Sequence, residues 1–354
     1  MSSGNAAGSP GVRATRATRA PGAARAAFPF RAAVDRRVRG ARCAAAALTA
    51  ACLAWSLVSC GERFDLPPQP LYEIPIPEPG TFNLKSVWTL DRPTDLALSG
   101  IYVFIIQGHE RVSAFYSTQI APRTPPWISA YEGLLAPVLV TVCKRDSLFV
   151  IVADSADMRC KIYNYLGGPP IQSFTDTLWN RFSGLAADGN LNIYVADAER
   201  DTIQSYDRWG HPRRVVSDYG TGSGYVIDPH GLAHNGRMLL VADTGKNWVQ
   251  RLRPDTTNIA AISEPIGRQE GLLLGPLDVA SDVRGDYIYV ADTGHDRVLK
   301  FQTLGAFEDT VYSAEKIPLA TPLVGPRFVC GEDSLVFVSD PEENRVLLLQ
   351  LKPL

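Results

Sequence analysis

Four residues of the chain have the side chains of an acid–base site and occupy neighbouring positions in short, similar runs. Each run begins with proline and continues through apolar residues to a small residue, and the four residues are Asp95, His230, Asp278 and Arg327. Histidine and carboxylates transfer protons, and a guanidinium stabilises negative charge, so this set suits a hydrolase or a lyase. That chemistry requires a fold that brings the four runs to one place.

The four runs belong to a repeat that spans most of the chain. Each run is followed by an alternating apolar segment, a turn and a second apolar segment, as in Asp286–Val298. The first apolar segments end at positions 106, 154, 197, 243, 292 and 340, so they recur every 43 to 49 residues. This period is typical of propeller blades. The β-branched and aromatic content predicts strands, and Gly294 is expected to take a positive φ in its turn.

The repeated pattern resembles a known family of repeats. Pro-x-Gly/Asp-φ-Ala followed by φ-Tyr-Val-Ala-Asp-x-Gly-x-x-Arg-φ is similar to the NHL repeat, present here six times over residues 92–351. The resemblance implies an all-β fold, a six-bladed β-propeller of NHL-like repeats. The aspartate that ends each apolar segment, such as Asp292, is expected to be structural, braced by an arginine five residues later.

Ring closure is predicted from a segment that belongs to no complete repeat. Residues 82–90 have a strand pattern, whereas the last repeat lacks one strand for a four-stranded blade. An N-terminal strand that completes the last blade would close the ring and remove an exposed sheet edge.

Ligands of such propellers usually enter at the axial mouth, where the inner strands begin. The predicted ligand-binding face contains Thr94, Ser183, His230, Arg327 and Trp248, and its surrounding turns predict a mixed but acidic charge. His211 and His234 fall in turns on the opposite face, where solvated side chains are expected.

Two enzyme resemblances bear on the mouth. Peptidyl-hydroxyglycine lyases use this fold and hold zinc with several histidines, and residues 229–231 resemble one such element. A catalytic zinc needs three protein ligands, and the equivalent positions of the other repeats hold no histidine, so no metal site is predicted. Axial calcium or zinc has no support from the sequence, and no cofactor is predicted. Streptogramin-lyase-like and lactonase-like propellers are the second comparison, with His230, Arg327, Asp95 and Asp278 as candidate catalytic residues.

The first sixty residues differ in kind from the repeats. An Arg-rich segment precedes the apolar stretch 44–57, whose length suits a signal peptide. The following Leu57-Val-Ser-Cys60 resembles a bacterial lipobox and predicts lipidation of Cys60; an ordinary secretory signal is the alternative. The predicted organisation is a lipoprotein signal peptide with a long Arg-rich n-region (1–60), a Pro-rich tether (61–80) and the propeller (81–354). Gly61 after the cysteine favours sorting to the outer membrane, if the cell has one.

The charge of the predicted mature protein excludes one class of partner. The first sixty residues hold nine arginines and one aspartate, which leaves 26 basic and 36 acidic residues and a formal charge of −10. Nucleic-acid binding depends on neutralising phosphates, so no nucleic-acid partner is expected.

The leading functional hypothesis is therefore non-catalytic. It is a monomeric propeller, anchored in the cell envelope through the lipid on Cys60, that binds a protein, peptide or glycan. The alternative is a hydrolase or lyase with its site at the axial mouth.

Overall fold

A computed structural model describes residues 82–122, 126, 130–255, 265–269, 271–332 and 334–351. The signal peptide and tether predicted for residues 1–80 lie outside this part of the chain. The chain divides into two compact units, and all described residues belong to the unit Pro70–Leu354. Within the described residues, no helix has the length and apolar character needed to cross a membrane.

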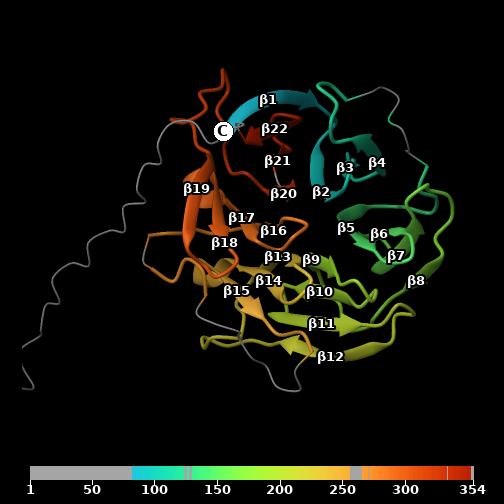
Figure 1. Cartoon of the computed structure of the whole chain (residues 1–354). Coiled ribbons are helices and arrows are strands. Elements are labelled where there is room, and N and C mark those ends of the chain that lie inside the picture. Colours follow the sequence, from blue (N-terminus) through green and yellow to red (C-terminus); the bar gives the residue numbers. More distant parts are fainter. Residues whose placement is uncertain are drawn as a thin grey trace, which may run out of the picture. The chain divides into compact units, whose positions relative to one another are not determined.

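The described residues form six small antiparallel sheets around one axis, which confirms the predicted six-bladed β-propeller (Figure 1). Blade 1 contains β2 (Pro93–Ser99), β3 (Tyr102–Gln107) and β4 (Arg111–Tyr116). Blade 2 contains β5 (Pro137–Lys144), β6 (Leu148–Asp154), β7 (Arg159–Asn164) and β8 (Gln172–Phe174). Blade 3 contains β9 (Phe182–Ala187), β10 (Ile193–Asp197), β11 (Thr202–Tyr206) and β12 (Pro212–Ser217).

The other three blades follow the same order from the axis outward. Blade 4 contains β13 (Pro229–His234), β14 (Leu239–Asp243) and β15 (Trp248–Leu252), with the 3₁₀ turn η1 (Thr244–Lys246). Blade 5 contains β16 (Asp278–Ser281), β17 (Tyr287–Asp292), β18 (Arg297–Gln302) and β19 (Phe307–Tyr312), with the 3₁₀ turn η2 (Thr293–His295). Blade 6 contains β20 (Phe328–Glu332), β21 (Leu335–Asp340), β22 (Arg345–Leu351) and β1 (Phe82–Thr89).

The inner strands lie close enough to require small residues. Each inner strand contacts the inner strand of the next blade, and β20 contacts β2 to complete the ring. A Cβ atom on Gly184 would lie 2.7 Å from the carbonyl oxygen of His230 in the next blade. Gly231 likewise faces the carboxylate of Asp278 with no room for a side chain. Glycine at these positions allows neighbouring blades to pack around the axis.

Ring closure by the N-terminal strand is confirmed. Strand β1 pairs antiparallel with β22, from Phe82 opposite Leu351 to Thr89 opposite Arg345. Trp88 of this strand is fully buried, with its ring 5.7 Å from Phe115 of blade 1 and 5.4 Å from Phe337 of blade 6. The first described strand therefore joins the last blade to the first.

The repeated aspartates hold the turns at the mouth. Asp292 accepts the backbone N–H of Leu274 at 2.7 Å and the guanidinium of Arg297 at 2.7 Å. Asp340 pairs with Arg345 in the same way. In blade 2, however, Asp154 pairs with Lys161 at 2.7 Å, while Arg159 donates to Ser173 instead. The lysine takes the place that the repeat pattern predicts for the arginine.

The turn after β17 corrects the prediction for Gly294. Asp296 adopts the left-handed conformation with φ of 53°, and equivalent turns place Asn247 and Asn344 there. Asp and Asn tolerate this region because their short side chains bond to the local backbone. Gly294 is needed for space, since a Cβ atom there would lie 2.6 Å from the carbonyl oxygen of Leu274.

Candidate functional site

A cavity of about 380 Å³ opens at the axial mouth, where the inner strands begin. It brings together four of the five predicted ligand-face residues, Thr94, Ser183, His230 and Arg327. These residues come from blades 1, 3, 4 and 6, so the site exists only in the closed ring. We call this space the mouth cavity. The remaining lining side chains belong to Arg92, His109, Val138, Leu139, Arg181, Phe182, Phe328, Pro341 and Glu342.

The lining of the mouth cavity is basic, although the surrounding turns carry acidic residues. Its lining has three arginines, Arg92, Arg181 and Arg327, against one carboxylate, Glu342. Arg327 lies 3.8 Å from Glu342, and both side chains are largely exposed. An exposed ion pair of this kind is weak, so the guanidinium remains available to a ligand.

His230 is held as a neutral base beside a cation. Its Nδ1 lies 3.1 Å from the carbonyl oxygen of Asp228 and 3.2 Å from Oγ1 of Thr244, whose own hydroxyl donates to Pro276. Both partners of Nδ1 are therefore acceptors, which assigns the ring proton to Nδ1. Nε2 then accepts from Nη2 of Arg181 at 2.9 Å. Burial lowers the pKa of His230, the carboxylate and carbonyl of Asp228 oppose this effect, and Arg181 lowers the pKa further.

Two hydroxyl groups complete the polar lining. Ser183 donates to the carbonyl oxygen of Pro229 at 2.6 Å and so joins blade 3 to blade 4. The hydroxyl of Thr94 is buried and has no hydrogen-bond partner among the described residues. A buried hydroxyl without a partner is unfavourable by about 1–3 kcal/mol, and a bound polar group would relieve this penalty.

Asp95 and Asp278 are separated from His230 and Arg327. They line a second cavity of about 160 Å³ along the axis, between the inner strands. Leu139 and Phe328 line both cavities, so this axial channel lies next to the mouth cavity. The four catalytic candidates therefore divide into a pair at the mouth and a pair inside the channel.

The two aspartates connect neighbouring inner strands. Asp95 accepts the N–H of Val140 in blade 2 at 2.7 Å, and Asp278 accepts the N–H of Val329 in blade 6 at 2.8 Å. Burial raises the pKa of Asp278 to about 7. Burial, and then repulsion by Asp278, raises the pKa of Asp95 well above its usual value. These hydrogen bonds give both carboxyl groups a structural role, because they join neighbouring inner strands.

Trp248 and two histidines lie away from the mouth cavity. The Trp248 indole donates to Asp243 at 2.8 Å, in the place that arginine occupies in blades 5 and 6. His211 is exposed and bonds to Asp207 at 3.0 Å, as expected of a turn residue. His234 is instead partly buried and stacks in parallel with Tyr194, so it is not a solvated turn residue.

Sequence reasoning missed two of the three arginines. Arg92 and Arg181 directly precede the inner strands β2 and β9. A basic residue just before an inner strand could have indicated these two arginines. It was not used because the turn before the strand does not belong to the repeat pattern. Within the described residues, no group of three or more His, Cys, Asp or Glu side chains has the geometry of a metal site.

The fold and the site together define a six-bladed β-propeller with a basic, ligand-sized cavity at its axial mouth. The chain is similar to virginiamycin B lyase from Staphylococcus aureus, with a TM-score of 0.52 and 13% identity over 77% of this chain and 100% of that chain. It is also similar to a streptogramin B lyase, with a TM-score of 0.52 and 15% identity over 77% of this chain and 88% of that chain. These likenesses establish the propeller fold. No family model and no curated protein matches the chain.

Proposed function

We propose that the protein is a membrane-anchored extracytoplasmic binding module whose mouth cavity holds an acidic group of a protein, peptide or glycan partner. The observation that carries this proposal is the convergence of Arg92, Arg181 and Arg327 on one cavity with a single carboxylate. Guanidinium groups bind carboxylate, phosphate and sulfate oxygens through paired hydrogen bonds.

The direction of the first strand is compatible with anchoring at Cys60. Phe82 lies at the end of β1 that pairs with Leu351, whereas Thr89 pairs with Arg345 next to the mouth turns. Phe82, the first described residue, therefore lies at the face opposite the mouth.

Calorimetric titration of the purified protein with acidic and neutral peptides and glycans tests the mouth cavity. We expect binding of acidic members, weakened about tenfold or more in Arg181→Gln and Arg327→Gln, because each variant removes a charge-assisted hydrogen bond. Arg208→Gln is the matched control, since this exposed arginine lies in the turn after β11, outside the mouth cavity. Equal affinity in Arg181→Gln and in the unchanged protein contradicts the proposal.

A lyase or hydrolase remains the second candidate, favoured by one observation. His230 is neutral, its Nδ1 is bound on the protein side, and its Nε2 faces a guanidinium in the mouth cavity. A neutral imidazole can accept a proton while the cation stabilises the developing negative charge. Two solved structures with a similar fold are a virginiamycin B lyase and a streptogramin B lyase, so a streptogramin B is the first substrate to test. Conversion of the streptogramin that is detected by mass spectrometry and lost in His230→Gln would favour the enzyme. If no conversion is detected, the binding module remains the proposed function.

A further inference from the structure

A third cavity, of about 640 Å³, lies between blades 3 and 4 on the side away from the mouth. One wall comes from the β9–β10 hairpin and from β11 and β12 of blade 3, and the other from the β13–β14 hairpin and the end of β15 in blade 4. We call it the interblade pocket. Its volume falls in the range of small-ligand sites. It shares no lining residue with the mouth cavity.

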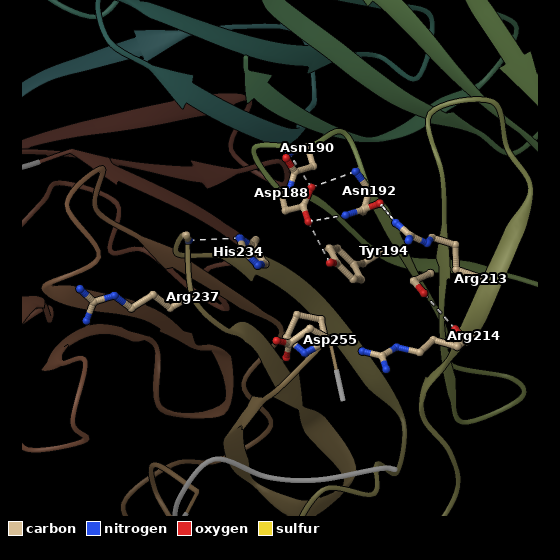
Figure 2. Close-up of a pocket in the computed structure, with 12 residues that line it drawn as sticks. Asp188, Asn190, Asn192, Tyr194, Arg213, Arg214, His234, Arg237 and Asp255 are labelled. Atoms are coloured by element: carbon tan, nitrogen blue, oxygen red, sulfur yellow. Dashed lines mark hydrogen bonds between the residues drawn. The ribbon is translucent and has the colours of Figure 1, made fainter. Parts of the chain in front are cut away.

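The upper wall of the interblade pocket is a rigid polar network (Figure 2). Asp188 accepts the N–H groups of Asn190 and Asn192 at 2.9 Å, the Asn192 amide at 2.6 Å and the Tyr194 hydroxyl at 3.3 Å. Arg213 donates to the side-chain oxygen of Asn192. These bonds use the acceptor capacity of Asp188 and fix the orientation of the side chains around it.

An aromatic pair continues this wall. The rings of Tyr194 and His234 are parallel, at 1°, with centroids 5.8 Å apart. Burial lowers the pKa of His234, so its imidazole is neutral at pH 7, and its Nδ1 accepts the N–H of Gly236 at 3.1 Å. The ring proton is therefore on Nε2, which leaves a hydrogen-bond donor on a ring that also offers an apolar face.

Two charged side chains in the lower part of the pocket do not pair with each other. Arg214 lies on the wall from blade 3 and Asp255 on the wall from blade 4, and among the described residues the two form no direct ion pair (Figure 2). Nη2 of Arg214 is buried and has no hydrogen-bond partner among the described residues. A buried donor of this kind is unfavourable.

We infer that the interblade pocket is a carbohydrate-binding site. A sugar hydroxyl both accepts and donates, so adjacent hydroxyls can accept from Arg214 and donate to Asp255. The lining combines such charged groups with the exposed amide of Asn190 and with the partly buried imidazole of His234, a ring against which the apolar face of a sugar can lie. Its near balance of basic and acidic side chains fits a polyhydroxylated ligand better than an anion, and the volume suits a short oligosaccharide. This inference does not depend on the function proposed for the mouth cavity.

The test is binding of the purified protein to a printed glycan array, followed by calorimetry with the oligosaccharides that bind. Arg214→Gln removes the charge and the donor fork but keeps a side chain of similar shape, and Asp255→Asn removes the matching acceptor charge. We expect each variant to weaken the binding of neutral oligosaccharides about tenfold or more, while Arg208→Gln binds them as the unchanged protein does. Thermal unfolding of the variants should match that of the unchanged protein, because Nη2 of Arg214 makes no hydrogen bond within the protein.

Four outcomes overturn the inference. The first is that no glycan binds. The second is that glycans bind with equal affinity to Arg214→Gln and to the unchanged protein. The third is that only polyanionic glycans bind and Arg208→Gln weakens them as much as Arg214→Gln does, which would indicate general charge attraction. Loss of binding in Arg181→Gln alone would assign the glycan to the mouth cavity and overturn the interblade site while supporting the proposed mouth function.

Discussion

Nη2 of Arg181 lies 2.9 Å from Nε2 of His230 at the axial mouth. The two residues come from neighbouring blades, 49 positions apart in the sequence. A cation at this distance disfavours a second positive charge on the imidazole, and burial acts in the same direction. The pair therefore keeps His230 neutral and presents a guanidinium together with an imidazole to any ligand that enters the mouth cavity.

Removal of the Arg181 charge should make His230 easier to protonate. We expect the pKa of His230 to rise in Arg181→Gln, since burial remains but the cationic repulsion is lost. Proton–nitrogen correlation spectra of the imidazole ring over pH 4–8 measure this change. His234 on the opposite face is the internal control and should titrate alike in both proteins. An unchanged titration of His230 would show that the contact with Arg181 is not maintained in solution.

The buried pair in the axial channel should make stability depend on pH. The folded-state pKa of Asp278 is about 7, above the value of about 3.9 for a solvated aspartate, so the folded protein binds the extra proton between these values. The free energy of unfolding should therefore fall as the pH rises from about 4 to about 7, and this contribution should level off above that range.

Asp278→Asn mimics the protonated carboxyl and should reduce this pH dependence. Urea unfolding at pH 5, 6, 7 and 8 gives the slope for each protein. Asp146→Asn is the control, because the Asp146 side chain is 93% exposed. The explanation fails if Asp278→Asn and the unchanged protein lose stability in parallel over this range.

Ring closure predicts a large effect for one side chain of β1. Trp88→Ala should lower the free energy of unfolding by about 3–5 kcal/mol, because it empties a fully buried site between blades 6 and 1. Val87→Ala changes the adjacent residue, which is 42% exposed, and should cost less than about 1 kcal/mol. Urea unfolding of both variants measures the difference. Equal effects would mean that β1 does not bind the first and last blades together.

Lipidation of Cys60 predicts the location of the protein in cells. Expressed in a bacterium with its leader, the protein should be found in the membrane fraction and require detergent for release. Cys60→Ala should move it to the soluble fraction or leave it unprocessed, since the lipid would no longer be attached. Cys52→Ala changes a cysteine inside the apolar stretch and should leave fractionation unaltered. Membrane association that survives Cys60→Ala would exclude the lipid as the anchor.

The sequence by itself determined the architecture of the propeller. A period of 43 to 49 residues with one strand pattern in each unit leads to six blades, because each unit buries its apolar faces only against its neighbours. The incomplete last repeat and the spare strand before the first one predicted the closure by β1, since an unpaired sheet edge is unfavourable. Four of the five predicted ligand-face residues also meet in the mouth cavity, because they occupy equivalent places in the repeat.

Only the tertiary structure decided the chemistry at the mouth and beyond it. Thr94 and Asp95 are consecutive, yet one lines the mouth cavity and the other the axial channel, because successive residues of a strand point in opposite directions. Arg92 and Arg181 precede strands, outside the repeated pattern, and make the lining of the mouth cavity basic. The interblade pocket joins segments of two blades through contacts that belong to no single repeat. Repetition in the sequence specifies the elements that all blades share, whereas a site is built from the side chains in which the blades differ. Whether these side chains meet depends on how far along the axis the closed ring places each of them and on the direction in which each one points.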